Sequence, residues 1–317
     1  MTGFFNVYKE AGYTSHDVVA IVRKLTGAKA GHTGTLDPQA EGVLPVCIGR
    51  ATKLADMITG QEKSYVAEVI LGVTTDTGDM TGQELSRSPV QFNEDAVCKA
   101  VEGFLGPQTQ IPPMYSALKI GGKRLYELAR KGQTVERKPR AVNISAIRVV
   151  EYRPENNSFV IDVTCSKGTY IRSLCMDIGE VLGTGAAMGS LLRTRSGAFY
   201  IDAAVRLSRI KEAVSDGSIS ELLLNVEDML AFPRAFVQAE GMTMAKNGNP
   251  VPLELVDMSD AVMENTEQHE HDDCADKVRL YGHDYCSGKV WLHGPDGLIG
   301  LFKLNSGSAK LRLEVML

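Results

Sequence analysis

The segment from Gly31 to Pro45, GHTGTLDPQAEGVLP, places one carboxylate in a loop rich in glycine and proline. The carboxylate belongs to Asp37, and His32, Thr33 and Thr35 lie close to it in sequence. A carboxylate presented in this way can act as a nucleophile and divide one difficult step into two easier ones through a covalent intermediate. Asp37 is therefore the first candidate for a catalytic residue.

The backbone of this loop is expected to be specified residue by residue. Gly31, Gly34 and Gly42 are expected to supply backbone angles closed to other residues, and Pro38 disfavours a helix at Asp37. An isolated Asp-Pro pair most often only starts a β-turn. The whole string, however, resembles almost letter for letter the GxLDPxAxGxLP signature of the TruB-type tRNA pseudouridine synthases. That resemblance implies that Asp37 is the catalytic nucleophile.

Three further segments are similar to the same family, so that with a C-terminal segment discussed below the resemblance covers nearly the whole chain. They are Lys63-Ser64-Tyr65 (family K-x-Y), residues 165–172 (CSKGTYIR) and residues 191–195 (LLRTR, the family's late L-R-x-R-x-G segment). The resemblance implies that Tyr65 stacks on a uracil and assists removal of its C5 proton. It also places Lys63 among the substrate-binding residues.

Arg172 is the predicted partner of Asp37. An ionised carboxylate in a water-poor pocket is costly unless it is paired, and an arginine fork suits a bidentate contact with it. The alternative, a surface arginine at a helix start, is disfavoured because a positive charge there opposes the helix dipole. We therefore expect Arg172 to hold Asp37 ionised and aimed.

A uridine stacked in folded RNA must be flipped out before an enzyme can reach it, at a cost of a few kcal/mol. We assign His32 to fill the space that the base leaves, and a histidine that merely caps the turn is the alternative. Tyr170 and Leu192 are expected to line the uracil pocket, a role that is compatible with core packing.

The expected reaction is an isomerisation that breaks an N-glycosidic bond and joins the same two rings through carbon, which needs no ATP, redox cofactor or metal. The sequence contains neither a P-loop nor Rossmann glycines. The histidines and cysteines between His269 and His293 fit no zinc pattern. We therefore expect no cofactor and no metal. Attack by Asp37 on ribose C1′ or on uracil C6 is left open.

The stretch from Lys119 to Arg140 contains eight Lys or Arg residues against two Glu, with Tyr126 among them and Tyr115 just before them. A bare charge run is usually a solvated face, but this density with interleaved aromatics is typical of a phosphate-binding surface. Residues 107–140 resemble the tRNA-gripping insertion of stand-alone family members, which argues against dependence on a guide RNA. The residues expected to clamp the T-stem and loop are Lys119, Lys123, Arg124, Arg130 and Arg140.

The net charge of −5 is concentrated in one segment. Glu254 to Asp276 holds nine acidic residues and no Lys or Arg, which leaves 34 basic against 30 acidic residues, a net of +4, elsewhere. The charge balance is therefore compatible with a nucleic-acid partner. We expect residues 254–276 to form an exposed, flexible acidic loop.

The composition indicates a cytoplasmic protein. No apolar run approaches the roughly 18 residues of a membrane span, and the N-terminus lacks a signal-peptide pattern. The six cysteines form no CxxC pair, so they are expected to be reduced and mostly buried, which excludes a disulfide scaffold and a zinc ribbon. We expect a monomer without a membrane partner.

The length of 317 residues indicates about two domains, and the interspersed helix and strand patterns predict an α+β protein. A helix is predicted between the Thr14–Asp17 capping box and Gly27, and others near 52–58, 93–104 and 173–182. Strands are predicted at 43–48, 65–71 and 159–165, and a turn-rich loop at 74–82. Spacings too short for βαβ crossovers favour a mixed, mostly antiparallel sheet flanked by helices, which the resemblance identifies as the pseudouridine-synthase fold. This catalytic domain is expected to span 1–233.

Residues 234–317 are expected to form a second, smaller domain. Short strands at 278–281, 289–293, 298–302 and 310–316 with Gly-rich turns predict a small β-barrel. The segment KNGNPV and the later GLIGLF are similar to the PUA-type RNA-binding module that closes the chain in this family. That similarity implies a grip on the acceptor end of tRNA.

Two other functions remain open at this point. A uridine-specific RNA N-glycosidase would use the same carboxylate but admit water, and would release free uracil. An RNA-folding chaperone would bind tRNA without needing catalysis for its role.

Overall fold

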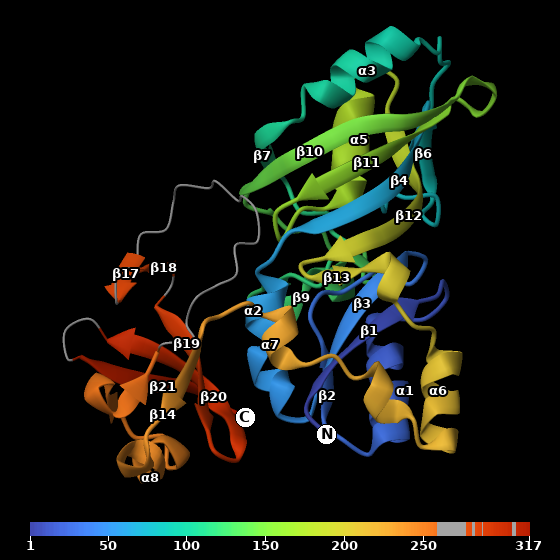
Figure 1. Ribbon diagram of the computed structural model, residues 1–317. Helices are drawn as coiled ribbons and strands as arrows, with labels where there is room; N and C mark the ends of the chain where they lie inside the picture. Colours follow the sequence, from blue (N-terminus) through green and yellow to red (C-terminus); the bar gives the residue numbers. More distant parts are fainter. Residues whose placement is uncertain (259–276, 281–282, 287, 306–308) are drawn as a thin grey trace.

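The computed structural model describes residues 1–258, 277–280, 283–286, 288–305 and 309–317. Two large sheets organise these residues, one of nine strands and one of six near the C-terminus (Figure 1). The acidic loop that we predicted at 254–276 lies, from residue 259 on, outside the described residues. Residues 254–257 belong to a 3₁₀ turn and to strand β16 (Val256–Asp257).

The nine-stranded sheet is mixed and mostly antiparallel, which confirms the predicted fold class. β3 and β12 run parallel, and the other neighbours in the sheet run antiparallel. β2 (Ala30–His32) pairs with β3, and β13 (Phe199–Tyr200) pairs with β12. The main order is β1 (Gly3–Lys9), β3 (Glu41–Ile48), β12 (Ala186–Ser196), β4 (Lys63–Leu71), β11 (Ser158–Cys165), β10 (Arg140–Arg153) and β7 (Gly106–Gln110).

Two pairs of helices cover different halves of this sheet (Figure 1). α1 (Ser15–Thr26) and α6 (Leu207–Asp216) pack on β1 and β3, where Val18 and Val22 of α1 enter a common core. α3 (Glu94–Glu102) and α5 (Ile171–Val181) pack on the half that contains β4, β10 and β11. Each pair therefore buries an apolar face against the sheet.

Most predicted boundaries hold within two residues. The Thr14–Asp17 capping box is present, and Gly27 ends α1 with a φ of 65°. The short helix predicted near 52–58 is a 3₁₀ turn, Gly49–Leu54, followed by α2 (Ala55–Thr59). The loop predicted at 74–82 is the turn of a hairpin between β5 (Val73–Thr75) and β6 (Glu84–Arg87).

Residues 111–139 leave the sheet between β7 and β10, and we call this segment the arm. It contains the two-stranded ribbon of β8 (Lys119–Ile120) and β9 (Lys123–Arg124), followed by α4 (Leu125–Ala129). Leu125 and Leu128 are the buried apolar residues of α4. These two leucines therefore anchor α4, whereas Lys119, Lys123 and Arg130 of the arm are exposed.

The C-terminal sheet is a nearly closed barrel of six strands, as predicted. β17 (Lys277–Leu280) and β18 (His283–Cys286) form a separate hairpin, so the strand predicted at 278–281 does not join the barrel. Helix α8 (Met242–Lys246) lies beside the barrel (Figure 1). The order is β15 (Val251–Pro252), β21 (Lys310–Met316), β20 (Gly297–Asn305), β19 (Lys289–Gly294), β14 (Arg234–Val237) and β16.

The barrel packs directly against the rest of the molecule, next to α2 and α7 (Val226–Met229) (Figure 1). Trp291 of β19 is fully buried in a cluster that contains Phe4 and Leu54, and its Nε1 donates to the carbonyl of Leu230 at 2.9 Å. Lys53 donates to the carbonyl of Met316 at 2.9 Å. The two sheets therefore share one hydrophobic cluster.

No helix within the described ranges is long and apolar enough to cross a membrane.

Candidate active site

Asp37 lies in the loop between β2 and β3, where β3 meets the parallel strand β12. Gly42 adopts a φ of 102°, and a Cβ there would lie 2.2 Å from the carbonyl oxygen of Arg193. Glycine is therefore required for the close approach of the two strands. Gly31 and Gly34 do not have positive φ angles, so our expectation about special backbone angles is correct for Gly42 alone.

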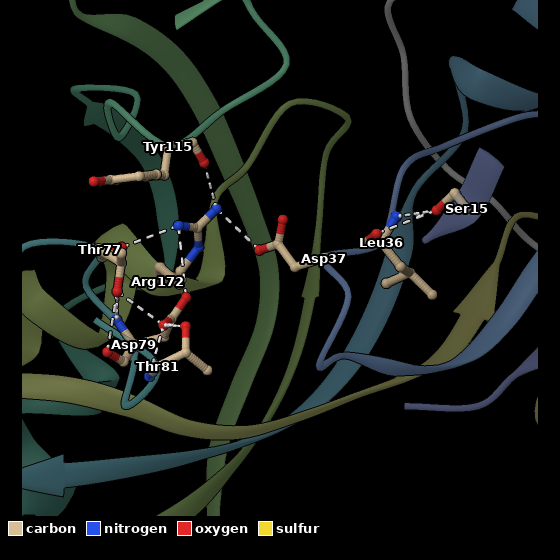
Figure 2. A network of polar contacts seen from close by, with 8 residues as sticks. All are labelled: Ser15, Leu36, Asp37, Thr77, Asp79, Thr81, Tyr115 and Arg172. Atoms are coloured by element: carbon tan, nitrogen blue, oxygen red, sulfur yellow. Dashed lines mark hydrogen bonds and ion pairs between the residues drawn. The ribbon is translucent and has the colours of Figure 1, made fainter. Parts of the chain in front are cut away.

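The loop is tied on both sides of Asp37. The hydroxyl of Ser15, in the first turn of α1, accepts from the Leu36 amide at 2.9 Å and donates to its carbonyl at 3.2 Å (Figure 2). Lys9 is fully buried, and its Nζ donates to the carbonyls of Pro38 at 3.0 Å and Ala40 at 2.6 Å. Burial lowers the pKa of Lys9 to about 8. Sequence reasoning missed Lys9, because its partners are fixed by the fold.

Arg172 contacts Asp37 from the first turn of α5. Its Nη2 lies 2.9 Å from Oδ2 of Asp37, and the exposed fractions of the two side chains are 6% and 41%. The same guanidinium donates to the carbonyls of Tyr115 at 2.8 Å and Thr77 at 3.0 Å (Figure 2). The contact with Asp37 is therefore a single N–O pair, and the bidentate fork that we expected is divided among several acceptors.

Asp79 is a second carboxylate beside Arg172, with its Oδ2 3.6 Å from Nη1. Its Oδ1 accepts from the Thr77 hydroxyl at 2.8 Å and from the amide and hydroxyl of Thr81 at 3.0 and 2.5 Å (Figure 2). Arg172 thus lies between two carboxylates. Burial raises the pKa of Asp37, and the Arg172 guanidinium acts in the opposite direction. The sequence indicated only a turn-rich loop around Asp79.

Asp37 and Arg172 line a cavity of about 270 Å³, together with the predicted residues Tyr65, Tyr170 and Lys63. Tyr65 comes from β4, and burial raises the pKa of its phenol. Tyr170 is the residue immediately before α5. The structure therefore brings five of the predicted site residues to one cavity from separate segments of the chain.

Leu192 is the one predicted cavity residue whose position differs from the structure. Leu191, and not Leu192, lines the cavity, because neighbouring residues of β12 point to opposite faces of the sheet. His32 lies on β2 outside the cavity lining, half-buried, with its Nδ1 accepting from the Gly34 amide at 3.4 Å. Burial lowers the pKa of His32 to about 4, so its imidazole is neutral at neutral pH.

Two protein-family models match consecutive parts of this chain. The model of the TruB family pseudouridylate synthase N-terminal domain matches residues 22–171, and that of the tRNA pseudouridylate synthase B C-terminal domain matches residues 172–231. The chain belongs to the TruB family. This membership confirms the family resemblance that the motifs carried, and it makes the protein a pseudouridine synthase.

Individual relatives and structures agree with this membership. A tRNA pseudouridine synthase B from Alkaliphilus oremlandii is 46% identical over 260 residues, which is 79% of this chain and 83% of the relative. One from Bacillus velezensis is 42% identical over 268 residues, 82% of this chain and 87% of the relative. A chain of a crystallised Cbf5-Nop10-Gar1 complex superimposes with a TM-score of 0.69 and 25% identity, over 99% of this chain and 84% of that chain.

Two buried cations complete the cavity wall of this TruB family member. Lys63 donates to the carbonyls of Thr59 at 2.8 Å and Gln61 at 2.6 Å, and burial lowers its pKa to about 8. Arg193 is 1% exposed, and it donates to the carbonyl of Gly34 at 3.0 Å and to that of Val43 at 2.7 Å. Both therefore fasten the backbone around the cavity. The sequence showed Arg193 only as part of a family motif.

The predicted clamp residues lie on the arm and at the start of β10. Lys119, Lys123, Arg130 and Arg140 are exposed, and Arg124 is half-buried. The Tyr126 ring has the Arg124 and Arg130 guanidinium carbons 5.8 and 5.4 Å from its centroid. Within the described ranges, none of the five forms an ion pair with a carboxylate. Their charge is therefore available for phosphate.

Within the described part of the chain, no three His, Cys, Asp or Glu side chains are grouped so that they could hold a metal ion. His269, His271 and Cys274 lie outside the described residues. His293 is described, and its Nε2 lies 2.9 Å from Glu227.

Proposed function

We propose that this protein converts a uridine in the T-loop of tRNA, at position 55, to pseudouridine. One observation carries the proposal: the carboxylate of Asp37 opens on a cavity and has a buried guanidinium, that of Arg172, 2.9 Å away. The name tRNA pseudouridine synthase B, borne by relatives that match most of this chain, supports the choice of tRNA.

In the proposed mechanism, Asp37 is the nucleophile and no cofactor takes part. The carboxylate forms a covalent bond with the flipped-out nucleotide, and the bond between N1 and C1′ breaks. The uracil then turns and C5 bonds to C1′. The proton on C5 is lost, N1 gains one, and the covalent bond to Asp37 breaks, which restores the carboxylate. Substrate and product therefore have the same atoms. Arg172 contributes by favouring the ionised form of Asp37.

Tyr65 and His32 are proposed to handle the flipped base. Because burial raises the pKa of Tyr65, its phenol is neutral at neutral pH. The neutral ring suits stacking on uracil better than the proton removal that the family resemblance implied. The neutral imidazole of His32 likewise suits stacking in the space that the base leaves.

The proposed RNA contacts divide between two domains, residues 1–233 and 234–317. The arm binds the T-stem and loop through its exposed cations, and the barrel binds the acceptor end. Phosphate contacts supply affinity, whereas the shape of the loop and the flipped base supply specificity. Because the arm is proposed to contact RNA directly, we propose that the protein acts without a guide RNA. We also propose that it is a monomer.

The test uses the purified full-length protein and an unmodified tRNA transcript without metal or nucleotide. The expected result is a pseudouridine in the T-loop at unchanged RNA mass. Asp37→Asn should retain the Kd for tRNA within about threefold and form no pseudouridine, since its amide cannot act as the nucleophile. Asp202→Asn, which changes an exposed aspartate, is the matched control.

Three outcomes would contradict parts of this proposal. Isomerisation by Asp37→Asn would exclude Asp37 as the nucleophile. Release of free uracil would indicate an N-glycosidase. Modification outside the T-loop would exclude the proposed position.

A further inference from the structure

Gln110 is a buried amide at the root of the arm that the mechanism above does not use. It is the last residue of β7 and is 3% exposed. Its Oε1 accepts from the amide of Tyr170 at 3.0 Å, and its Nε2 donates to the carbonyl of Tyr170 at 3.3 Å. Both ends of the side chain therefore hold the backbone of one residue, 60 positions away in the sequence.

Tyr170 is a sensitive point of the cavity wall. It is the N-cap residue of α5, has extended backbone angles (φ −102°, ψ 112°) and makes no side-chain capping hydrogen bond. It lines the cavity, and Arg172 follows it by two residues. A shift of the Tyr170 backbone would therefore move the start of α5 and the guanidinium that contacts Asp37.

Two more contacts join the same segments. The hydroxyl of Ser173 donates to the carbonyl of Ile111 at 3.2 Å. Arg172 donates to the carbonyl of Tyr115 at 2.8 Å. In these two contacts the side chain belongs to α5, whereas in the contact with Tyr170 the side chain belongs to Gln110 at the root of the arm. Gln110 can therefore be changed without altering α5 itself.

On the basis of the proposed function, we infer that Gln110 is a positioning residue: its amide fixes the Tyr170 backbone so that Arg172 meets Asp37, and it links the arm that binds RNA to the catalytic cavity. Packing alone would require only a side chain of this volume. The positioning role requires an acceptor for the Tyr170 amide and a donor for its carbonyl at the same time.

Gln110→Glu separates these two requirements. A glutamate has the same shape and still accepts from the Tyr170 amide, but only its protonated form can donate to the Tyr170 carbonyl. We expect its single-turnover rate of pseudouridine formation, relative to the unaltered protein at each pH, to fall by about 10- to 100-fold from pH 5.5 to pH 8, the scale that misplacement of a catalytic group produces. The Kd for tRNA should change less than threefold.

Gln110→Met supplies the comparison with packing alone. It keeps the volume and removes both hydrogen bonds, so its relative rate should be reduced at every pH without the trend of Gln110→Glu. Gln91→Glu introduces the same charge at an exposed residue outside the arm, and its relative rate should equal one throughout. Circular dichroism at each pH confirms that the compared variants are folded.

The inference is overturned if Gln110→Glu has a relative rate independent of pH, or if Gln110→Met matches the unaltered protein. A loss of tRNA affinity that accounts for the whole rate change would also overturn it, because Gln110 would then serve binding. The unaltered protein is measured in the same series. If it forms no pseudouridine, the proposed function fails, a result distinct from failure of the inference.

Discussion

At the scale of single residues, the site depends on how Arg172 divides its hydrogen bonds. It contacts Asp37 and Asp79 and donates to the carbonyls of Thr77 and Tyr115. A buried guanidinium with so many acceptors is held in one orientation. Asp37 keeps its second oxygen out of this contact, which leaves that oxygen available for the proposed attack.

Arg172→Lys should make catalysis more sensitive to acid. A compact ammonium cannot reach all of these acceptors, so it counteracts the effect of burial on the Asp37 pKa less strongly. The pKa of that carboxyl therefore rises further above its ordinary value. Because the ionised form is the proposed nucleophile, activity is lost as the pH falls through this pKa. The acid limb of the single-turnover rate should therefore move to higher pH in the variant.

Arg148→Lys is the matched control, since Arg148 pairs with Asp162 on an exposed part of β10 and β11. Its acid limb should coincide with that of the unaltered protein. A parallel drop in the Arg172→Lys rate at all pH values would mean that Arg172 does not control the ionisation of Asp37.

At the scale of elements, the catalytic loop is held from three sides. β1 supplies Lys9, α1 supplies Ser15, and β12 supplies Arg193. Gly42 allows β3 to run against β12 closely enough for Arg193 to reach the carbonyl of Gly34 in the loop. Position and orientation of Asp37 therefore follow from elements that carry none of the chemistry themselves.

Lys9→Met tests this support through stability. Removing the ammonium leaves the carbonyls of Pro38 and Ala40 without their buried donor, and the free energy of unfolding should decrease by about 1–3 kcal/mol. The pKa of Lys9 is lowered from 10.5 to about 8, so between these values the unfolded chain binds more protons than the folded one. Lys9 therefore makes stability rise with pH in that window.

Urea unfolding at pH 7.5 and pH 10 measures both effects. The stability gap between the unaltered protein and Lys9→Met should widen at the higher pH. Lys63 remains in both proteins, so its own titration cancels in the difference. A gap that is the same at both pH values would show that the Lys9 pKa is not lowered by folding.

The sequence could predict Asp37 and Arg172 because each lies in a motif whose residue types are required by the chemistry. It could not predict Lys9 or Gln110, because their hydrogen bonds go to backbone atoms that only the fold brings near. The prediction that Leu192 lines the cavity was wrong for a similar reason, since Leu191 lines it instead. Register shifts on both sides of residues 191–193 in β12 decide which face a side chain takes, and no sequence pattern marks them.

At the scale of the whole molecule, the arm and the barrel are the two surfaces proposed to bind RNA. The double variant Lys119→Gln and Lys123→Gln should lower the slope of log Kd against log salt by about 0.7–0.9 for each phosphate that the protein no longer neutralises. The single-turnover rate at saturating protein should stay unchanged, because neither residue lines the cavity. Lys211→Gln, on the exposed side of α6, is the control. An unchanged slope would exclude both lysines as phosphate ligands.

Trp291 decides whether the barrel and the catalytic sheet unfold together. Its ring fills the cluster shared by both, so Trp291→Ala should cost about 3–5 kcal/mol and split a single calorimetric transition into two. Trp291→Phe keeps most of the ring but loses the hydrogen bond to the Leu230 carbonyl, and should cost about 1 kcal/mol with one transition preserved. Because no described residue of the barrel lines the cavity, Trp291→Ala should still isomerise uridine at saturating protein while binding tRNA more weakly. A single transition in Trp291→Ala would mean that interactions such as that of Lys53 with Met316 suffice to couple the two parts.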